Sequence, residues 1–289
     1  MHFVKSLKIG NSEMLGLTVI ATELPFPSDV IGVIGMGVFK DCLLTLDYPA
    51  SKLTLTRGEL PPANGQDILD FTQPRQASSI PVIAVEMCGE PAEFALDSGM
   101  GGCWAAFTKE IADRCTYAYG PVNGPKRRMV DREIDTRVAR LNGRMKFGAY
   151  TVEQPHGVVS SDADRHSVIG SRILESFAIT LDQQNSRVRF TRKGTSPIVP
   201  PPFRVVGFNL QQEEEGFAVW GLMAGSPAER AGIKNGDIVV TINDKPVAEV
   251  YGLPAWDQLL KNDTIDIRYK AAGESSPRHV KLEVWELVP

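Results

Sequence analysis

The sequence predicts a mainly β protein in which a two-lobed domain is followed by a smaller, separate domain. Three observations predict this class. Short runs of alternating apolar and polar residues are bounded by glycine, proline and asparagine, which is typical of strands and hairpins. A gapless repeat in the first two-thirds of the chain indicates two equivalent lobes. A proline-rich stretch near residue 200 then separates a region of different composition.

The composition is that of a globular protein. The 289 residues correspond to about two domains. With 43% apolar residues, 23% charged residues and a net charge of −4, the chain lacks the basic stripe of a nucleic-acid-binding protein. No apolar run approaches the ~18 residues of a membrane span, and the first residues show no signal-peptide pattern. We therefore expect neither a nucleic-acid partner nor a transmembrane segment in this chain.

The repeat relates residues 33–57 to residues 168–192 at a constant offset of 135. Nine of the 25 aligned positions are identical. Each copy begins with Val-Ile-Gly, continues with a predicted helical turn, and ends in a hairpin with period-2 alternation. We expect each copy to begin as a short buried strand that ends at the glycine.

A second hairpin delivers a carboxylate into a tight turn. Residues 80–96 are predicted to form two strands that turn at residues 88–91, and Asp97-Ser98-Gly99 follows directly. Asp97 is therefore expected where a buried strand ends, facing the backbone amides of Ser98 and Gly99. An isolated Asp-Ser-Gly triplet is usually an ordinary surface turn, but the apolar hairpin before it favours a functional site.

The Asp-Ser-Gly turn and the later Val168-Ile169-Gly170 resemble two motifs of aspartic proteases of the retropepsin and pepsin type. In that family Asp-Thr/Ser-Gly is the active-site turn, and two apolar residues and a glycine close each lobe against it. The resemblance implies acid-protease-like β-barrel lobes and aspartic endopeptidase chemistry at Asp97, Ser98 and Gly99. It also implies a polypeptide substrate, no cofactor and no metal.

Only one lobe is complete by this resemblance. It spans residues 78–193, whereas residues 1–60 represent the C-terminal half of a first lobe. Neither Asp29 nor Asp41 is followed by Ser/Thr-Gly. The family mechanism needs two carboxyls that share a proton, so Asp97 alone would act only as a base. The second aspartate would come from a homodimer, as in retropepsins, or from an upstream segment, and the half-lobe favours the upstream segment.

A cysteine-protease reading is weaker. The segment at 102–107, Gly-Cys-Trp-Ala-Ala-Phe, is similar to part of papain-like proteases. Such an enzyme needs a distant histidine and an upstream glutamine, but His279 lies in a different predicted domain and Asp97 takes the place of the glutamine. Packing of Cys103 and Trp104 behind the Asp turn is the favoured interpretation.

The remaining cysteines and histidines carry no metal-binding pattern. The four cysteines show no CxxC spacing. Cys103 and Cys115 lie close enough in the sequence to pair, and buried free thiols are an equally good account. The four histidines lack the spacing of metal ligands, and we expect them at the surface.

Beyond a proline-rich linker at residues 194–202, the chain changes character. Residues 225–232 form a complete short-helix signature, with a capping serine, a proline at the first helical position and a terminal glycine. Glu229 is expected to complete a capping box. Further elements are predicted at 238–242 (strand), 254–261 (helix), 264–269 (strand) and 280–287 (strand).

The pattern Ser-Pro-Ala-x-x-Ala-Gly-x-x-x-Gly-Asp, followed by a strand and Ile-Asn, closely resembles PDZ domains, here residues 203–289. Such a domain is a small β-sandwich or barrel with two helices. The resemblance implies a carboxylate-binding loop at 205–208 whose N–H groups form an anion nest, and a strand at 208–210 to which a peptide adds. Leucines of the second helix would wall the groove, with core packing an equally good account. The predicted peptide-binding residues are Val206, Gly207, Phe208, Leu210, Leu259 and Leu260.

Two functions follow from these resemblances. The first is an aspartic endopeptidase whose PDZ domain recruits or gates the substrate. The second is a catalytically inactive, protease-like scaffold that captures C-terminal or extended peptides in the PDZ groove. A homodimer stays open in either case. Chains that join such a protease to a PDZ domain are often exported, so the resemblance points to a periplasmic or other external location.

Overall fold

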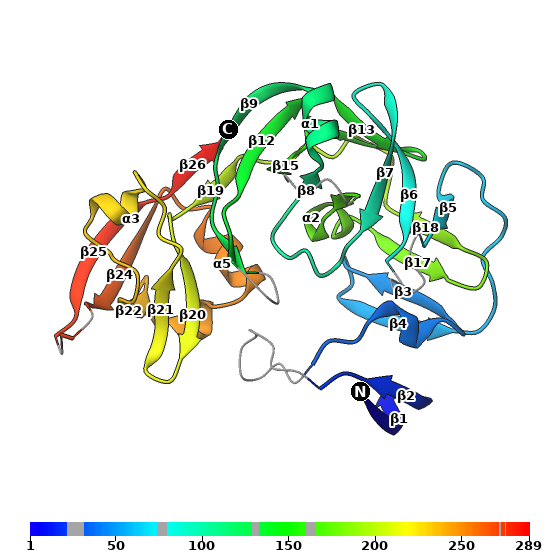
Figure 1. Ribbon diagram of the computed structural model, residues 1–289, viewed down its shortest axis with the longest axis horizontal. Helices are drawn as coiled ribbons and strands as arrows, with labels where there is room; N and C mark the ends of the chain where they lie inside the picture. The colour runs from blue at the N-terminus through cyan, green and yellow to red at the C-terminus, as the bar shows by residue number, and fades with distance from the viewer. Residues whose placement is uncertain (22–31, 74–79, 129–132, 160–165, 272, 275) are drawn as a thin grey trace. The chain divides into compact units, whose positions relative to one another are not determined.

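The computed structural model describes residues 1–21, 32–73, 80–128, 133–159, 166–271, 273–274 and 276–289 (Figure 1). Strands dominate these residues, which confirms the predicted mainly β class. The chain divides into two compact units. The first unit comprises residues 1–106, 143–153 and 164–198, and the second unit comprises residues 107–142, 154–163 and 199–289. The division therefore runs through the predicted lobe at 78–193.

One open sheet organises the first unit. Its strands follow the order β4-β3-β17-β18-β5-β6-β7-β16-β8, and only β7 and β16 pair in parallel. The bounds are β3 (Leu43–Asp47), β4 (Lys52–Thr56), β5 (Ile68–Thr72), β6 (Val82–Met87), β7 (Glu90–Leu96), β8 (Ala105–Phe107), β16 (Ser167–Ile169), β17 (Ala178–Asp182) and β18 (Arg187–Thr191). In addition, β13 (Arg144–Phe147) pairs with β6 and with β14 (Tyr150–Glu153). Within the described residues this path does not close on itself, so the closed barrels that the resemblance implied are not formed.

The two copies of the sequence repeat adopt matching local structures. In the first copy η1 (Met36–Phe39) precedes β3 and β4, and in the second copy α2 (Ser171–Leu174) precedes β17 and β18. The copies join through β3 and β17, where Thr45 lies opposite Thr180 and the two hydroxyls share a hydrogen bond of 2.9 Å. Ser51 and Ser186, also 135 residues apart, both have positive φ angles, which is uncommon outside glycine.

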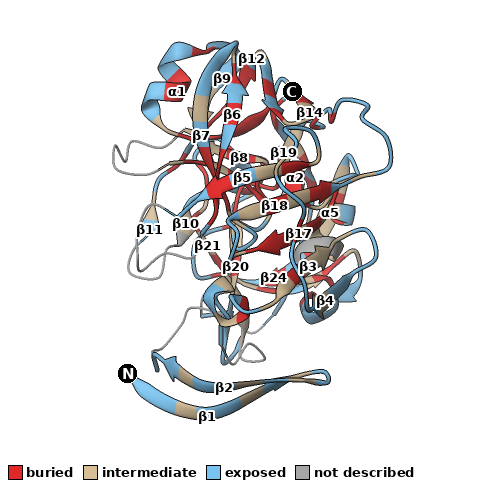
Figure 2. Cartoon of the chain, turned by 90° about the vertical axis from the view of Figure 1, so that its right-hand side faces the viewer, coloured by how far each residue is buried: buried red, intermediate tan, exposed pale blue. Residues whose placement is uncertain are grey.

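The copies differ at their first residues. Ile169 is fully buried in β16, between β7 and β8. Val33 and Ile34 are instead 68% and 49% exposed and form no strand, so the expected buried strand is wrong for the first copy. The reason is the absence of a partner, because no described hairpin flanks Val33 and Ile34 as β7 and β8 flank β16. The preceding strands β1 (His2–Ile9) and β2 (Ser12–Val19) pair only with each other, and Figure 2 shows no buried residue on them.

The predicted helix at 105–114 is partly wrong. Residues 105–107 form β8, which pairs with β16, and α1 (Lys109–Arg114) begins only after Thr108. The Thr108 hydroxyl accepts the N–H of Ile111 and caps this helix. Pairing with β16 satisfies the backbone of Ala105 and Ala106, and this tertiary contact overrides their helix propensity.

Aromatic side chains fill the core of the first unit. Phe147 and Phe190 have ring centroids 5.2 Å apart, and Tyr150 meets Phe177 edge-on at 4.8 Å. The Tyr150 hydroxyl donates to the carbonyl oxygen of Phe190 at 2.8 Å, which satisfies the one polar group that this cluster buries with it.

The second unit contains two sheets of different origin. An antiparallel sheet joins β9 (Thr116–Asn123), β12 (Arg137–Asn142) and β15 (His156–Val159), and the short pair β10 (Arg127–Arg128) and β11 (Glu133–Ile134) lies between β9 and β12 in the chain. The C-terminal sheet has the order β20-β21-β22-β24-β25. Its strands are β20 (Asn209–Glu213), β21 (Gly216–Trp220), β22 (Ile238–Ile242), β24 (Thr264–Lys270) and β25 (Arg278–Glu283), with β23 (Lys245–Pro246) beside β22.

The helices of this region are α3 (Pro227–Arg230), α4 (Val247–Val250) and α5 (Leu253–Leu259), and β19 (Phe203–Val205) pairs with β26 (Trp285–Val288). The predicted strand at 238–242 is confirmed, whereas the predicted strand at 280–287 is two strands, β25 and β26. Ser226 caps α3 as expected, by accepting the N–H of Glu229. The capping box is displaced by one residue, because the Glu229 carboxylate accepts the N–H of Gly225.

A buried arginine fixes the predicted linker at its C-terminal end. Arg140, on β12, is 7% exposed. Its guanidinium presents five donors in a planar fork, which suits several acceptors at once. It donates to four backbone carbonyl oxygens, those of Gln154, Pro200, Pro201 and Pro289.

His156 lies beside this arginine, and the expectation of a surface histidine is wrong for it. It is 3% exposed, its ring hydrogen-bonds the carbonyl oxygen of Pro201 at 3.0 Å, and it packs against Phe203 with 5.7 Å between ring centroids. Burial, with a further contribution from Arg140, lowers the pKa of His156 to about 3. The imidazole is therefore neutral in the folded protein at ordinary pH.

This burial predicts a specific loss of stability in acid. An unfolded histidine binds its proton near pH 6.5, whereas folded His156 does so only near pH 3. Because the unfolded state then binds the extra proton, His156 should lower the free energy of unfolding as the pH falls from 6.5 toward 3. The loss should reach about 1.4 kcal/mol per pH unit. Urea unfolding between pH 7 and 4 should show a weaker pH dependence in His156→Gln than in the wild type, whereas His2→Gln, at an exposed position, should leave it unchanged. Equal slopes in wild type and His156→Gln would contradict a buried neutral histidine.

Candidate functional site

Asp97 stands at the end of β7, in a turn fixed to its neighbour strand. The buried Leu96 is the last residue of β7 and lies opposite Ile169 of β16. The N–H of Asp97 donates to the carbonyl oxygen of Ile169 at 3.1 Å. The N–H of Gly99 donates to Asp97 Oδ1 at 2.8 Å. The half-buried carboxylate thus faces a backbone amide, as the sequence predicted for Gly99.

The start of α2 holds the rest of this loop. The N–H of Gly170 donates to the carbonyl oxygen of Trp104 at 2.9 Å, and the N–H of Arg172 donates to that of Cys103 at 3.1 Å. The N–H of Ser171 donates to Met100 at 3.3 Å. The backbone of Cys103 and Trp104 therefore packs behind the Asp turn, in agreement with the interpretation favoured from the sequence.

Glycine is required at position 170 for space. A Cβ there would lie 2.4 Å from the carbonyl oxygen of Cys103, although the φ angle of −85° is ordinary. At Gly35, the matching residue of the first copy, a Cβ would meet nothing within 4 Å and φ is −74°.

These two glycines form a matched pair for mutation. Gly170→Ala should destabilise the protein by about 1–3 kcal/mol because the backbones that hold the Asp turn must separate. Gly35→Ala should instead be neutral or stabilising by up to about 1 kcal/mol, since alanine narrows the unfolded ensemble. Thermal and urea unfolding of both variants measure this. Similar effects at the two positions would refute the asymmetry between the copies.

Sequence reasoning missed one residue beside the turn. Tyr48 follows β3 directly, and its hydroxyl hydrogen-bonds the side chain of Ser98. Burial raises the pKa of Tyr48, the carboxylates of Glu175 and Asp97 raise it further, and the hydrogen bond to Ser98 opposes them. No motif marks Tyr48 in the sequence, because the segment that contains it lies about 50 residues before the turn it reaches.

The aspartates that the two copies share have structural tasks. Asp47 Oδ1 accepts the N–H of Ala50 at 3.1 Å in the turn after β3. Asp182 is buried and accepts hydrogen bonds from the N–H of Leu60 and from Asn185. Burial alone would raise the pKa of Asp182, but these hydrogen bonds lower it. Neither residue is therefore available to share a proton with Asp97.

Of the aspartates that precede the repeat hairpins, Asp41 is exposed after η1, and Asp29 lies outside the described residues. The cysteine-protease reading gains no support. Cys103 is a buried free thiol, and His279 pairs with Asp266 at 3.2 Å within the second unit. Cys103 does not pair with Cys115, which is itself disulfide-bonded.

The predicted carboxylate-binding loop follows β19. Gly207 has φ = +97°, and its carbonyl oxygen accepts the N–H of Met223 at 2.7 Å. In the described part of the chain, the N–H groups of Gly207 and Phe208 donate no hydrogen bond, which leaves them for a ligand. The next strand, β20, is at the edge of its sheet and pairs only with β21 among the described strands. An open strand edge beside free N–H groups is the geometry that strand addition requires.

The side chains predicted for the groove belong to the core. Val206, Phe208, Leu210 and Leu259 are all less than 10% exposed within one hydrophobic cluster, and Leu260 packs against it. Only the backbone of the loop and of β20 therefore remains to contact a peptide. Gly207 is constrained as well, since a Cβ would lie 2.2 Å from the Cβ of Ser226. A larger residue at position 207 would disturb the α3 cap and would not test ligand binding cleanly.

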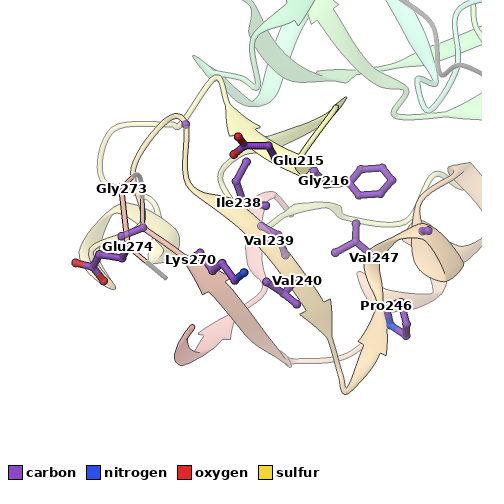
Figure 3. Close-up of a pocket in the computed structure, with 14 residues that line it drawn as sticks. Glu215, Gly216, Ile238, Val239, Val240, Pro246, Val247, Lys270, Gly273 and Glu274 are labelled. Atoms are coloured by element: carbon purple, nitrogen blue, oxygen red, sulfur yellow. The ribbon is translucent and has the colours of Figure 1, made fainter. Parts of the chain in front are cut away.

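A pocket of about 710 Å³ lies elsewhere on this domain (Figure 3). It is bordered by β21, β22, α4 and the end of β24, with Glu215, Lys270 and Glu274 at its polar margin. None of the six residues predicted to bind peptide lines it. The pocket is thus separate from the predicted carboxylate-binding loop.

The described residues contain no cluster of three or more His, Cys, Asp or Glu side chains that could hold a metal ion. Among the helices that the structure describes, none has the length and apolarity to cross a membrane.

Comparison with known proteins identifies the C-terminal region. Residues 221–269 match the family model of the PDZ domain. No curated protein matches the chain. A solved structure, the crystal structure of a retropepsin-like aspartic protease from Rickettsia conorii, aligns with 43% of this chain and 89% of its own length, at 18% identity and a TM-score of 0.32. The chain therefore contains a PDZ domain, preceded by a β-rich region that carries one Asp-Ser-Gly turn.

Proposed function

We propose that this protein is an aspartic-type endopeptidase in which Asp97 is one of two catalytic carboxylates. The observation that carries the proposal is the Asp97 turn itself. Its carboxylate ends a buried strand, accepts the N–H of Gly99, and is fixed through the backbone of Ile169. A carboxylate held in this way can take a proton from a water molecule that attacks a peptide carbonyl.

The reaction needs a second carboxyl that donates a proton to the peptide carbonyl. Two carboxyls in contact cannot both ionise, so one holds the proton that the other lacks. Asp47 and Asp182 are occupied by their own turns. In this proposal the second Asp-Thr/Ser-Gly turn is supplied by a second copy of the chain or by further sequence linked to it.

The proposed task of the PDZ domain is to capture the peptide that is cleaved or that gates cleavage. The free N–H groups of Gly207 and Phe208 would receive a terminal carboxylate, and the edge of β20 would pair with the residues before it. Backbone recognition of this kind selects an apolar C-terminal segment rather than a specific sequence.

A second candidate is a protease-like scaffold without catalysis. The observation that favours it is the lack, among the described residues, of a second Asp-Thr/Ser-Gly turn, together with the exposure of Val33 and Ile34 where such a turn would pack. The working part would then be the PDZ domain alone. Cleavage assays separate the two candidates.

Asp97→Asn should lower peptide cleavage by about 10²–10⁴-fold, because an amide cannot cycle the proton. Statine-type inhibitors should block the same activity. The matched control is Asp113→Asn, which changes an exposed carboxylate of α1 that pairs with Lys109. Mass spectrometry of a peptide library measures cleavage, and thermal unfolding checks the fold. Activity that survives Asp97→Asn, or that stops when Cys103 is alkylated, would move the chemistry to another site.

The PDZ loop should distinguish free from amidated peptide ends. We expect peptides with an apolar last residue and a free C-terminus to bind at roughly micromolar affinity, about −8 kcal/mol. Amidation should weaken binding by about 1.5–3 kcal/mol, the range for a hydrogen bond to a charged group. Calorimetric titration of the full chain with both forms of one peptide tests this. Equal affinities would show that the loop does not bind a terminal carboxylate.

A further inference from the structure

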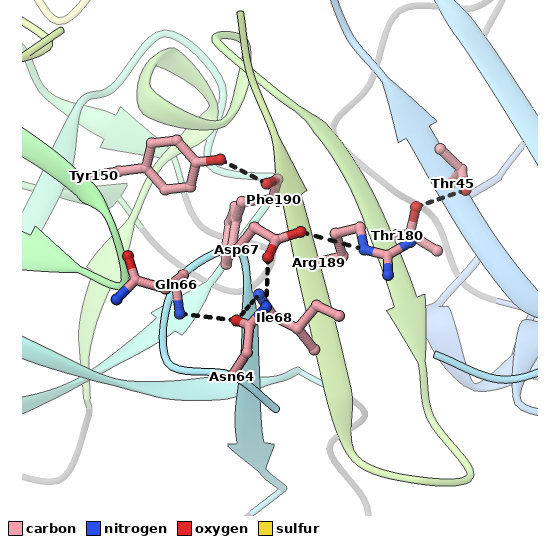
Figure 4. A network of polar contacts seen from close by, with 9 residues as sticks. All are labelled: Thr45, Asn64, Gln66, Asp67, Ile68, Tyr150, Thr180, Arg189 and Phe190. Atoms are coloured by element: carbon pink, nitrogen blue, oxygen red, sulfur yellow. Dashed lines mark hydrogen bonds and ion pairs between the residues drawn. The ribbon is translucent and has the colours of Figure 1, made fainter. Parts of the chain in front are cut away.

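The residue that follows the shared Leu-Asp of each repeat copy reaches into the opposite copy. These residues are Tyr48 and Gln183, which are 135 positions apart. Gln183 Nε2 donates to the carbonyl oxygen of Met36, the first residue of η1, at 2.8 Å. The Tyr48 hydroxyl hydrogen-bonds Ser98, next to Asp97. The two contacts are related in the same way as the hydrogen-bonded pair Thr45 and Thr180, where the copies join (Figure 4).

The backbone fixes the place from which Tyr48 reaches. Its N–H donates to the carbonyl oxygen of Phe177 at 3.3 Å, and its own carbonyl oxygen accepts the N–H of Ser51 at 3.0 Å. Asp47 closes the same turn through Ala50. The half-buried side chain therefore projects from a rigid turn at the end of β3.

The tip of the Asp turn is the part that needs support. Backbone hydrogen bonds hold the turn at Asp97 and at Met100. Ser98 and Gly99 between them are exposed, yet the N–H of Gly99 must stay directed at Asp97 Oδ1. The contact with Tyr48 is the side-chain contact that the structure shows at this tip.

We propose that Tyr48 is a positioning residue that holds Ser98, and through it keeps the Gly99 N–H on the Asp97 carboxylate. Each copy of the repeat would thereby support the catalytic turn that lies over the other copy. The catalytic consequence of this inference rests on the proposed function, whereas its geometric part does not.

Tyr48→Phe removes the hydroxyl and keeps the ring, and Tyr150→Phe is the matched control. Tyr150 lies in the same unit, and its hydroxyl bonds the carbonyl oxygen of Phe190 inside the aromatic cluster (Figure 4). Water–amide exchange at Gly99, measured by NMR on the full chain, should be about fivefold faster in Tyr48→Phe, the factor for loss of about 1 kcal/mol. Tyr150→Phe should leave it unchanged.

A double-mutant cycle isolates the contact from general destabilisation. In a Ser98→Ala background, Tyr48→Phe should have no further effect on Gly99 exchange, because the hydroxyl has already lost its partner. If the two substitutions add, or if Tyr48→Phe does not change Gly99 exchange, the positioning role is refuted.

The catalytic consequence is read separately. Where the wild type cleaves peptides, Tyr48→Phe should lower kcat several-fold with KM nearly unchanged, and Tyr150→Phe should alter neither. An unchanged kcat together with faster Gly99 exchange would overturn the catalytic part. A wild type without peptidase activity would refute the proposed function, and the exchange experiment would still decide the role of Tyr48.

Discussion

The close approach of Gly170 to the backbone of Cys103 and Trp104 is the constraint on which the candidate active site depends. No side chain fits at position 170, because its Cβ would reach the Cys103 carbonyl oxygen. This contact lets α2 begin against the loop that follows Asp97, while β16 pairs with β7 on one side and β8 on the other. A carboxylate on a turn tied at both ends keeps its direction without help from a ligand, which is what a preorganised site requires.

The same Val-Ile-Gly tripeptide behaves differently in the two copies, and the reason is not local. In the second copy it is a buried strand and a helix start, whereas in the first copy Val33 and Ile34 are exposed. Identical residues with identical propensities thus take different structures according to whether strands are present to pair with them. The half of the repeat that pairs with its own counterpart, β3 with β17, has matching structure in both copies.

Local signals predicted what local contacts determine. The hairpin at 80–96, the strand at 238–242 and the cap at Ser226 depend on neighbours within a few residues. The sequence could not show contacts between distant segments. Arg140 bonds a carbonyl 149 residues away, and Tyr48 meets a turn from the other copy of the repeat. The wrongly predicted helix at 105–107 has the same cause, since β16 needs a partner and residues 105–107 provide it.

The relation between the copies also constrains where a second catalytic turn could lie. Tyr48 meets the Asp97 turn from the first copy, and Gln183 reaches the start of η1 from the second copy. A turn placed over the first copy, as the Asp97 turn is placed over the second, would pack on Val33 and Ile34 and lie near Gln183. Burying these two exposed apolar side chains would favour such an addition. The requirement for a second carboxylate and the exposed start of the first copy therefore point to the same place on the molecule.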